Sequence, residues 1–305
     1  MGSAGRYIDR ASAAQADLPQ NLRGGDSRAA GNVLGAVIDR ATQRRFTEVV
    51  SNNQAALKAA LEKSKANAIR NSRAALKTLN AAAAGRVKGL ATLPDVPTTG
   101  GNPQYDLQNT PFLIWPTNSV DLEASEIIPV NSFAKFRTSI GKNKSFYGDV
   151  KFYYLWSNPN NKFALINING YVIFNGHCFV GVGGGNFPAN RSATVGLTGS
   201  LQIFEWWNQP ATSPPAQPDQ KVDALKLRVT ANGWAEAGAI DARDFFRGFD
   251  LRYTLMIVPP FGTVVVAVTA AVVCGTGIDS GHAEADFASG AFQVGSPAVL
   301  FTILT

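Results

Sequence analysis

The sequence predicts a mainly β protein, an antiparallel β-sandwich that follows an α-helical and basic N-terminal arm. Beyond residue 110, about eight runs of strand composition are separated by turn-rich loops of uneven length, and no long helical pattern interrupts them. All five Trp residues and every Phe except Phe46 lie beyond residue 89. By contrast, residues 28–88 hold twelve Lys and Arg against three Asp and Glu. The chain is therefore predicted to have two parts of different character.

Composition also places the boundaries within the 305 residues. Residues 1–27 are polar and contain Pro and a Gly pair, which predicts a flexible tail. Residues 28–90 form the basic helical arm, and the Pro- and Gly-rich residues 91–110 are predicted to be an extended linker. Residues 111–305 then form the sandwich. The net charge of +6 comes from the arm, because residues 28–88 alone carry +9.

Apolar residues recur in the arm at three- and four-residue steps, in a background of Ala, Gln, Lys and Arg that favours helix. Gly31, Gly35 and the polar residues 51–53 predict breaks, so we expect two or three helical pieces. The apolar stripe is too narrow to hold a helical domain together by itself. It should pack against arms of neighbouring chains or against the sandwich through Leu57, Leu61, Leu76 and Leu79.

The Lys and Arg residues that surround this stripe concentrate positive potential, which is typical of a surface that contacts nucleic-acid phosphates. A solvated face on a helical bundle has the same pattern, and the sequence leaves both interpretations open. The candidate RNA-binding residues are Arg40, Arg44, Arg45, Lys58, Lys63, Lys65, Arg70, Arg73 and Lys77.

A strand–turn–strand pattern lies at the centre of the predicted sandwich. Residues 149–156 alternate, so that one side of the strand is apolar and should be buried: Val150, Phe152, Tyr154 and Trp156. Residues 158–161 (Asn-Pro-Asn-Asn) predict a reversal, and residues 162–168 run back as a β-hairpin partner. Further strands are predicted within 111–115, 127–140, 171–182, 201–207, 224–230, 251–258, 263–274 and 299–304.

Few residues have the pattern of a reactive site. Cys178 and Cys274 lie in apolar runs and are interpreted as buried free thiols, with a disulfide as the alternative. His177 and Cys178 are neighbours in a strand, so they should point to opposite faces and cannot act as a base and its nucleophile. These residues therefore offer no nucleophile with its base, and we predict no metal site and no cofactor.

Three other clusters could form a binding site or could have only a structural role. Residues 279–286 gather acids and a His, but their spacing fits no EF-hand loop, which favours a solvated acidic turn over a calcium site. The Gly-rich residues 181–185 are interpreted as a plain loop, since no helix follows that could hold a phosphate. Of Trp206 and Trp207, alternation places one in the core and leaves the other for a partner surface. We find no signal peptide and no apolar run long enough to span a membrane.

Two segments carry a resemblance to a known family. Residues 146–154, Phe-Tyr-Gly-Asp-Val-Lys-Phe-Tyr-Tyr, and residues 195–206, with Gly-Leu-Thr-Gly-Ser before an apolar strand that ends in Trp, resemble the jelly-roll capsid proteins of picorna-like positive-strand RNA viruses. Glu205 stands where the family pattern has Pro, and the long basic arm is not typical of the family. These departures are compatible with a divergent insect virus of the Nora virus kind.

The resemblance implies a structural coat protein that self-assembles into an icosahedral shell in the host cytoplasm and resides in the virion. Its expected partners are other capsid subunits, genomic RNA and a host receptor, with no stable membrane insertion and no enzymatic activity. Two other interpretations remain open. One is a non-viral β-sandwich module that binds glycan or protein through Trp206-Trp207 and the long loops. The other is a cupin-type enzyme, although cupin metal sites use several His and this chain has two.

Overall fold

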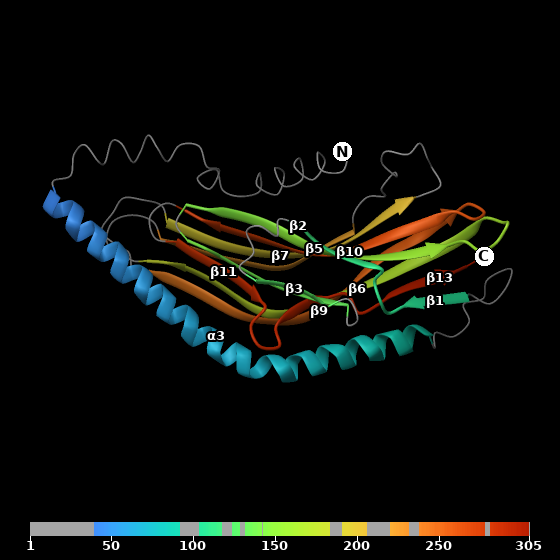
Figure 1. The fold of residues 1–305 in the computed structure, drawn as a ribbon, viewed down its shortest axis with the longest axis horizontal. Helices are drawn as coiled ribbons and strands as arrows, with labels where there is room; N and C mark the ends of the chain where they lie inside the picture. The colour runs from blue at the N-terminus through green and yellow to red at the C-terminus, as the bar shows by residue number, and fades with distance from the viewer. Residues whose placement is uncertain are drawn as a thin grey trace.

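The computed structural model describes residues 40–91, 104–117, 124–128, 132–141, 143–183, 191–205, 220–231, 238–277 and 281–304, with the side chains of the helix described from residue 55 to residue 85. Two antiparallel sheets pack face to face, and one long helix lies along the outer face of one of them (Figure 1). This arrangement confirms the predicted class, a mainly β sandwich with an N-terminal helix.

The smaller sheet has five strands in the order β2-β5-β10-β7-β8. The bounds of these strands are Leu113–Thr117 for β2, Ser145–Ser157 for β5, Thr263–Thr276 for β10, Arg191–Glu205 for β7 and Gln220–Ala231 for β8. Strand β10 pairs along its whole length with both β5 and β7, and it is rich in Val and Ala because it is buried on both faces.

The larger sheet has eight strands and is centred on β6, which pairs with β9 on one side and with β11, β12 and β13 on the other. Strands β3 and β4 extend it beyond β11, and β1 extends it beyond β13. The bounds are Gln104–Gln108 for β1, Ala124–Ile128 for β3, Phe133–Ile140 for β4, Ala164–Val182 for β6, Ala239–Val258 for β9, Gly281–Phe287 for β11, Gln293–Gly295 for β12 and Val299–Ile303 for β13.

The connections between the sheets give the jelly-roll topology. Strands β4, β6, β9 and β11 belong to the larger sheet in the order β4-β11-β6-β9, and β5, β7, β8 and β10 face them in the order β5-β10-β7-β8. Most successive strands therefore lie in opposite sheets. The inner faces meet in one hydrophobic core that includes Phe152, Tyr154, Phe174 and Phe301.

The strand–turn–strand pattern at the centre is not a hairpin, and that prediction is wrong. Strand β5 lies in the smaller sheet and β6 in the larger one, so the turn at residues 158–161 carries the chain across the sandwich. The Asn158 side chain fixes this crossing, because its amide donates to the carbonyls of Lys162 at 2.8 Å and Pro259 at 3.0 Å. The predicted inner side of β5 is confirmed, since Val150, Phe152, Tyr154 and Trp156 are all buried.

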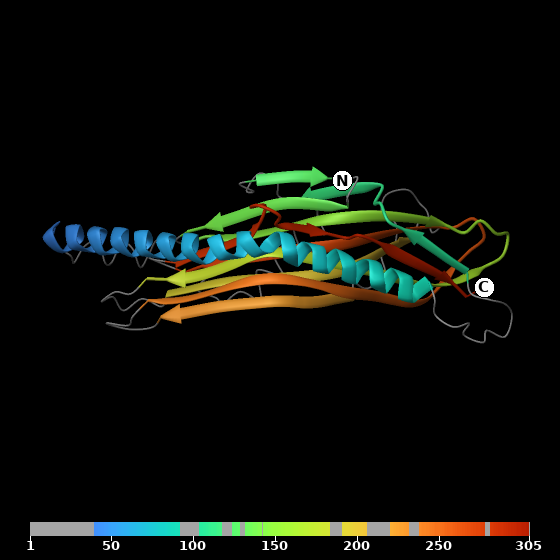
Figure 2. The ribbon, with the colours of Figure 1, turned by 90° about the horizontal axis from the view of Figure 1, so that it is seen from below.

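The described part of the arm differs from the prediction of a break at residues 51–53, whereas the predicted breaks at Gly31 and Gly35 lie outside the described residues. It forms one helix, α3, over Arg40–Ala91, which runs without interruption through residues 51–53 and through Gly85. Ser and Asn at residues 51–53 weaken a helix by less than about 1 kcal/mol each, and helix formation is cooperative, so the packing of residues 57–83 on the sheet offsets this cost. Figures 1 and 2 agree that α3 follows the larger sheet and that its N-terminal end reaches beyond the sandwich.

The segment predicted as a linker is in part a strand. Residues 104–108 form β1 and pair with β13 from Gln104↔Ile303 to Gln108↔Val299. The Pro and Gly residues that suggested a linker mostly precede this strand, so composition averaged over the segment concealed it. Both Cys178 and Cys274 are buried free thiols, as predicted, and burial raises the pKa of each thiol.

Candidate nucleic-acid interface

Helix α3 presents two faces of different composition. Its inner face lies against the larger sheet and follows the predicted stripe, extended by polar members. The buried residues of this face are Leu57, Leu61, Lys65, Ala68, Ser72, Leu79 and Ala83. They recur at steps of three, four and seven, which keeps them on one side of a helix with 3.6 residues per turn.

Apolar contacts hold both ends of the described part of the helix. Leu57 and Leu61 pack on Phe179 of β6, and Leu79 and Ala83 pack on a separate cluster with Ile173. The stripe therefore packs against the sandwich, one of the two predicted alternatives. Gly181 allows the close approach, because a Cβ there would lie 2.7 Å from Cδ2 of Leu57.

A buried ionic cluster holds the middle of the helix. Nζ of Lys65 donates to Oε1 of Glu284 at 2.9 Å and also binds the carboxylate of Asp286, both on β11. Burial acts to lower the pKa of Lys65, but its hydrogen bonds to the two carboxylates outweigh burial and raise this pKa. Burial alone would raise the pKa of Glu284, yet His282 and Lys65 lower it to about 2. Lys65 and Glu284 are therefore ionised at neutral pH.

Residues 279–286 were predicted to form a solvated acidic turn, and this prediction is wrong. Residues 281–286 belong to β11, where Glu284 and Asp286 point to the same side and are both buried. Asp286 is held by backbone donors, since its Oδ1 accepts from the amides of Ala288 at 2.9 Å and Ser289 at 3.0 Å. These backbone hydrogen bonds, together with the contact to Lys65, lower the free-energy cost of burying the Asp286 carboxylate.

A histidine links the helix to β9 as well. Nε2 of His177 lies 3.0 Å from Oγ of Ser64 on α3, and its Nδ1 lies 3.0 Å from Oδ1 of Asp244. Cys178 points the other way, into the core between the sheets. The prediction that these two neighbours face opposite sides is confirmed, and His177 serves to position the helix.

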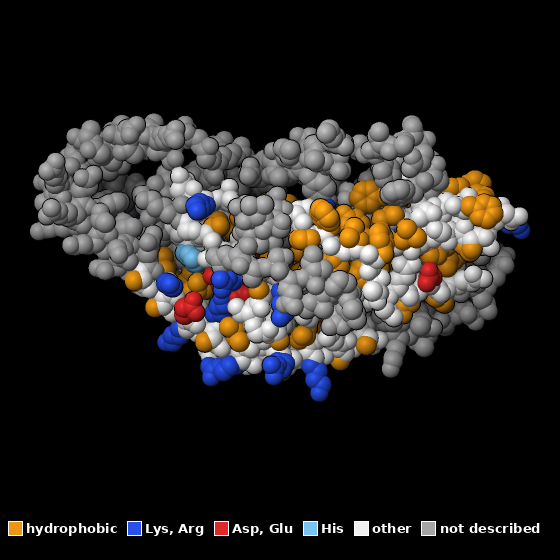
Figure 3. All heavy atoms as spheres, viewed as in Figure 1, with side chains coloured by type: hydrophobic (Ala, Val, Ile, Leu, Met, Phe, Trp, Pro, Cys, Tyr) orange, Lys and Arg blue, Asp and Glu red, His pale blue; other side chains and the backbone are white. Residues whose placement is uncertain are grey.

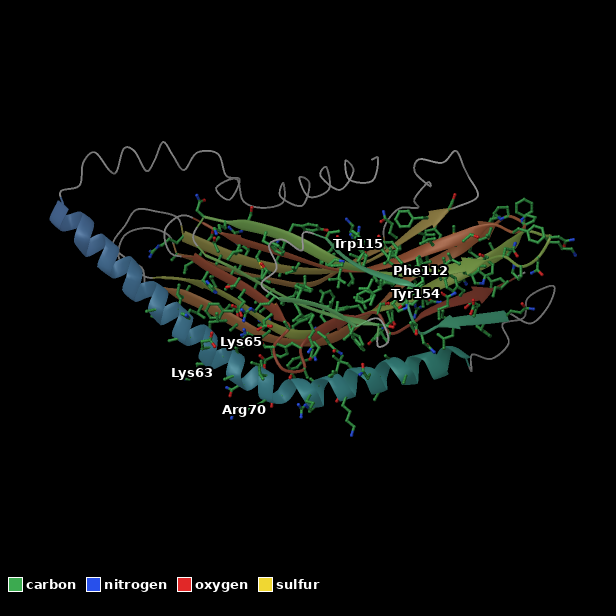
Figure 4. All side chains as sticks on the ribbon, in the orientation of Figure 1. Lys63, Lys65, Arg70, Phe112, Trp115 and Tyr154 are labelled. Atoms are coloured by element: carbon green, nitrogen blue, oxygen red, sulfur yellow. The ribbon has the colours of Figure 1, made fainter. Side chains whose placement is uncertain are left out.

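The outer face of α3 is cationic. Lys58, Lys63, Arg70, Arg73 and Lys77 are all exposed. Between residues 55 and 85 the one acid is Glu62, so the outer face carries five positive charges against one negative charge. In the part of the chain that the structure describes, these five cations form no ion pair. Figure 3 shows Lys and Arg side chains along this edge of the molecule, and Figure 4 shows Lys63 and Arg70 directed away from the sheets.

The nine residues predicted from sequence thus separate into three groups. Five of them form the outer face just described. Lys65 is removed from the candidate interface, because it is buried and bound by two carboxylates. Arg40, Arg44 and Arg45 lie on the N-terminal part of α3, and their side chains are outside the described residues.

Other sequence candidates add no second site. Trp206 and Trp207, on which the glycan-binding alternative rests, lie outside the described residues. Within the described residues, no cluster of three His, Cys, Asp or Glu could hold a metal ion. Strand β6 continues to Val182, so part of the predicted Gly-rich loop is strand. No helix among the described residues is long and apolar enough to cross a bilayer.

The anchoring residues Glu284, Asp286 and His177 were not predicted. A signal for Lys65 was present, because it stands four residues after Leu61 and three before Ala68, at the stripe's own spacing. Glu284 and Asp286 stand two residues apart in a run whose other residues are mostly apolar, and this spacing is consistent with one face of a strand. Nothing in the sequence indicated that this face would meet the helix.

No protein-family model matches this chain, and no curated protein matches it. Among solved structures, the chain is similar to TmCBM61 in complex with β-1,4-galactotriose, at 9% identity and a TM-score of 0.16, over 64% of this chain and 86% of that one. A chain of the infectious bursal disease virus Gt strain matches at 7% identity and a TM-score of 0.18, over 66% of this chain and 39% of that one. These weak similarities between β-sandwich folds assign the chain to no family.

Proposed function

We propose that this protein is a structural subunit of an icosahedral RNA-virus shell, and that the outer face of α3 contacts the packaged RNA. The observation that carries the proposal is a cationic helix face that is fixed along a jelly roll and whose five cations form no ion pair among the described residues. The resemblance of residues 146–154 and 195–206 to picorna-like capsid proteins supports the same function.

The geometry of α3 suits RNA phosphates. Lys58 and Lys77, the first and last cations of the outer face, are 19 residues apart in sequence. At 1.5 Å rise per residue they span about 28 Å, long enough to contact several phosphates of one strand. Contacts of this kind carry no base specificity, which suits a coat protein that must accept any part of a genome.

The attachment of the helix supports the proposal too. Apolar contacts, the cluster around Lys65 and the His177 bridge together direct the five cations to one side of the molecule. A helix whose charges only provided solubility would need no such fixed direction. In a shell whose subunits place this side inward, the cations would face the genome.

The test uses particles purified from cells that express the full chain. Wild-type protein should form particles of uniform size by electron microscopy, with RNA inside. Replacing Lys58, Lys63, Arg70, Arg73 and Lys77 with Gln should lower the RNA content, and for single-stranded RNA it should reduce the slope of log K against log salt by up to about 3.5. The matched control replaces five exposed cations of the strands and turns with Gln: Lys144, Lys221, Lys226, Arg228 and Arg247.

Two results would contradict the RNA contact. One is equal RNA content in wild-type particles and in particles of the five-Gln α3 variant. The other is rapid removal of α3 by trypsin from intact particles, since an inward helix is shielded. An absence of particles under all assembly conditions would contradict the capsid function itself.

A further inference from the structure

One end of the sandwich exposes large apolar side chains. Phe163, Leu255, Ile257 and Phe261 are 68%, 64%, 63% and 69% exposed, and together with Lys162 we call them the apolar tip. They come from the turn after β5 and from the end of β9 with the turn that follows it, at the right-hand end of Figure 1. Figure 3 shows hydrophobic side chains gathered at this end. Contiguous exposed apolar side chains of this size are typical of a binding surface.

The apolar tip is held in a fixed conformation. Leu255 has φ of 59° and Phe261 has φ of 58°, a backbone conformation that bulky residues rarely adopt. At Leu255 the pairing of β6 with β9 shifts register, and the amide of Leu255 donates to Oδ1 of Asn167 at 2.8 Å. The amide of Phe261 donates to the carbonyl of Asn160. The backbone conformation and these hydrogen bonds therefore hold the side chains in their exposed positions.

A groove lies beside the tip and shares its first turn. It has a volume of about 310 Å³ and opens between β1, β5 and the β5–β6 turn. Its lining includes Tyr105, Asp106, Leu155, Trp156, Pro159 and Ile303. The polar residues Gln104, Ser157 and Asn160 complete the lining, so the groove is part apolar and part polar, and its one acid is Asp106.

We propose that the apolar tip of one copy of this chain binds the groove of a second copy, with Lys162 of the tip paired to Asp106 of the groove. The tip is apolar, the groove offers it the side chains of Tyr105, Leu155 and Ile303, and each surface carries one charge of opposite sign. In the described part of the chain, neither Lys162 nor Asp106 forms an ion pair. The proposal rests on the proposed function in one respect: the second copy is then a neighbouring subunit of the shell.

The charges favour a second copy over a lipid surface. An apolar tip that inserts into an anionic membrane is usually surrounded by several Lys and Arg, because each contributes to the attraction. This tip has Lys162 alone, and Asp106 lies in the groove beside it. Opposite charges on two adjacent surfaces of one chain suit contacts between identical subunits, which must supply both halves of the interface.

The experiment measures self-association of the full chain by sedimentation velocity over a range of concentrations. Lys162→Glu and Asp106→Lys should each weaken association about tenfold, because each places like charges opposite one another. The double variant, Lys162→Glu with Asp106→Lys, should recover most of the loss, since it exchanges the charges. Lys144→Glu, a charge reversal in the turn before β5, is the matched control and should leave association unchanged.

Particle formation, followed separately by electron microscopy, distinguishes the two proposals. Small oligomers that the single variants disrupt and the double variant restores support the contact, even if wild-type protein forms no particles. Normal particles and normal association from both single variants overturn the contact and leave the capsid function standing. Flotation of wild-type protein with phosphatidylserine vesicles, lost in Phe163→Asp while self-association is unchanged, also overturns it, because the occupant is then a membrane.

Discussion

Two lysines within one turn of α3 have opposite surroundings. Lys65 is 5% exposed and binds Glu284 and Asp286 of β11, whereas Lys63 is exposed and points away from the sheets (Figure 4). Both belong to the same positively charged stretch of sequence, and both were candidate RNA-binding residues. Their separation by two residues rotates one of them by about 200° around the helix axis relative to the other. Position relative to the apolar stripe, more than charge, decides which role a lysine has here.

Placing a lysine at the inner position of α3 costs hydration free energy, whereas a lysine at the outer position keeps its hydration. Burying an ammonium and two carboxylates removes their hydration, and contact between them offsets that cost only while all three remain together. Such a cluster adds little net stability over apolar residues of the same volume. It does make one alignment of the helix on β11 much more favourable than its neighbours, because a shift by one residue would leave both acids unpaired.

The largest effect is therefore expected at the inner face. Lys65→Met keeps most of the side-chain volume but leaves Glu284 and Asp286 buried without their cation, which should lower the free energy of unfolding by about 3–5 kcal/mol. Lys63→Met is the matched control and should change it by less than about 0.5 kcal/mol. Urea unfolding measures both. Equal effects of the two substitutions would show that the inner and outer faces do not differ in the way described.

Strand β5 offers the same comparison within the sandwich. Trp156 is buried and stacks on Phe301 with ring centroids 6.1 Å apart, while its neighbour Leu155 is 44% exposed. Trp156→Ala should cost about 3–5 kcal/mol of unfolding free energy, because it leaves a cavity. Leu155→Ala should cost less than about 1 kcal/mol. A loss below about 1 kcal/mol for Trp156→Ala in urea unfolding would mean that the other face of β5 is the buried one.

Alternation predicted the inner side of β5 correctly but could not say which sheet comes next. A hairpin and a crossing between sheets have the same alternating pattern and the same turn residues at 158–161. What distinguishes them is the contact of Asn158 with the carbonyls of Val258 and Pro259, about a hundred residues further along the chain. The sequence around Asn158 does not indicate that it will contact Val258 and Pro259. The fold class could therefore be predicted, while this connection between the sheets could not.

In the candidate nucleic-acid interface, too, local patterns could be predicted from sequence but distant contacts could not. Five of the nine predicted cations lie on the outer face, since helical periodicity is local and readable from sequence. The role of Lys65 depends on two acids 219 and 221 residues away, whose own surroundings suggested a turn. Continuity of α3 through residues 51–53 is a further case, because Ser and Asn have low helix propensity there, while the described contacts that hold the helix to the sheet begin only at Leu57.

The third prediction concerns acid. The pKa of Glu284 is about 2 in the folded protein and near its ordinary 4.5 in the unfolded chain, so this group stabilises the fold above pH 4.5 and loses its contribution as the pH falls towards 2. Between pH 6 and pH 3 the loss should be about 2 kcal/mol. Urea unfolding of wild type and of Glu284→Gln at both pH values isolates this term. The same pH dependence in both proteins would show that Glu284 does not contribute it.

The smallest change in stability is expected at the outer face, where the five-Gln variant removes five charges at once. Arg73 lies three residues after Arg70 and four before Lys77, so these neighbours repel one another by about 0.2–0.5 kcal/mol per pair. Removing them relieves that repulsion, whereas removing Lys58 loses one attraction of similar size to Glu62, four residues on. These opposing terms should leave the free energy of unfolding within about 1 kcal/mol of the wild-type value in urea.

Loss of RNA from particles of a variant that is as stable as wild type would assign the effect to the phosphate contacts, because a misfolded or detached helix would also lower stability. A loss of 3 kcal/mol or more would instead mean that the outer cations take part in holding α3 to the sandwich, and the distinction between its two faces would no longer stand.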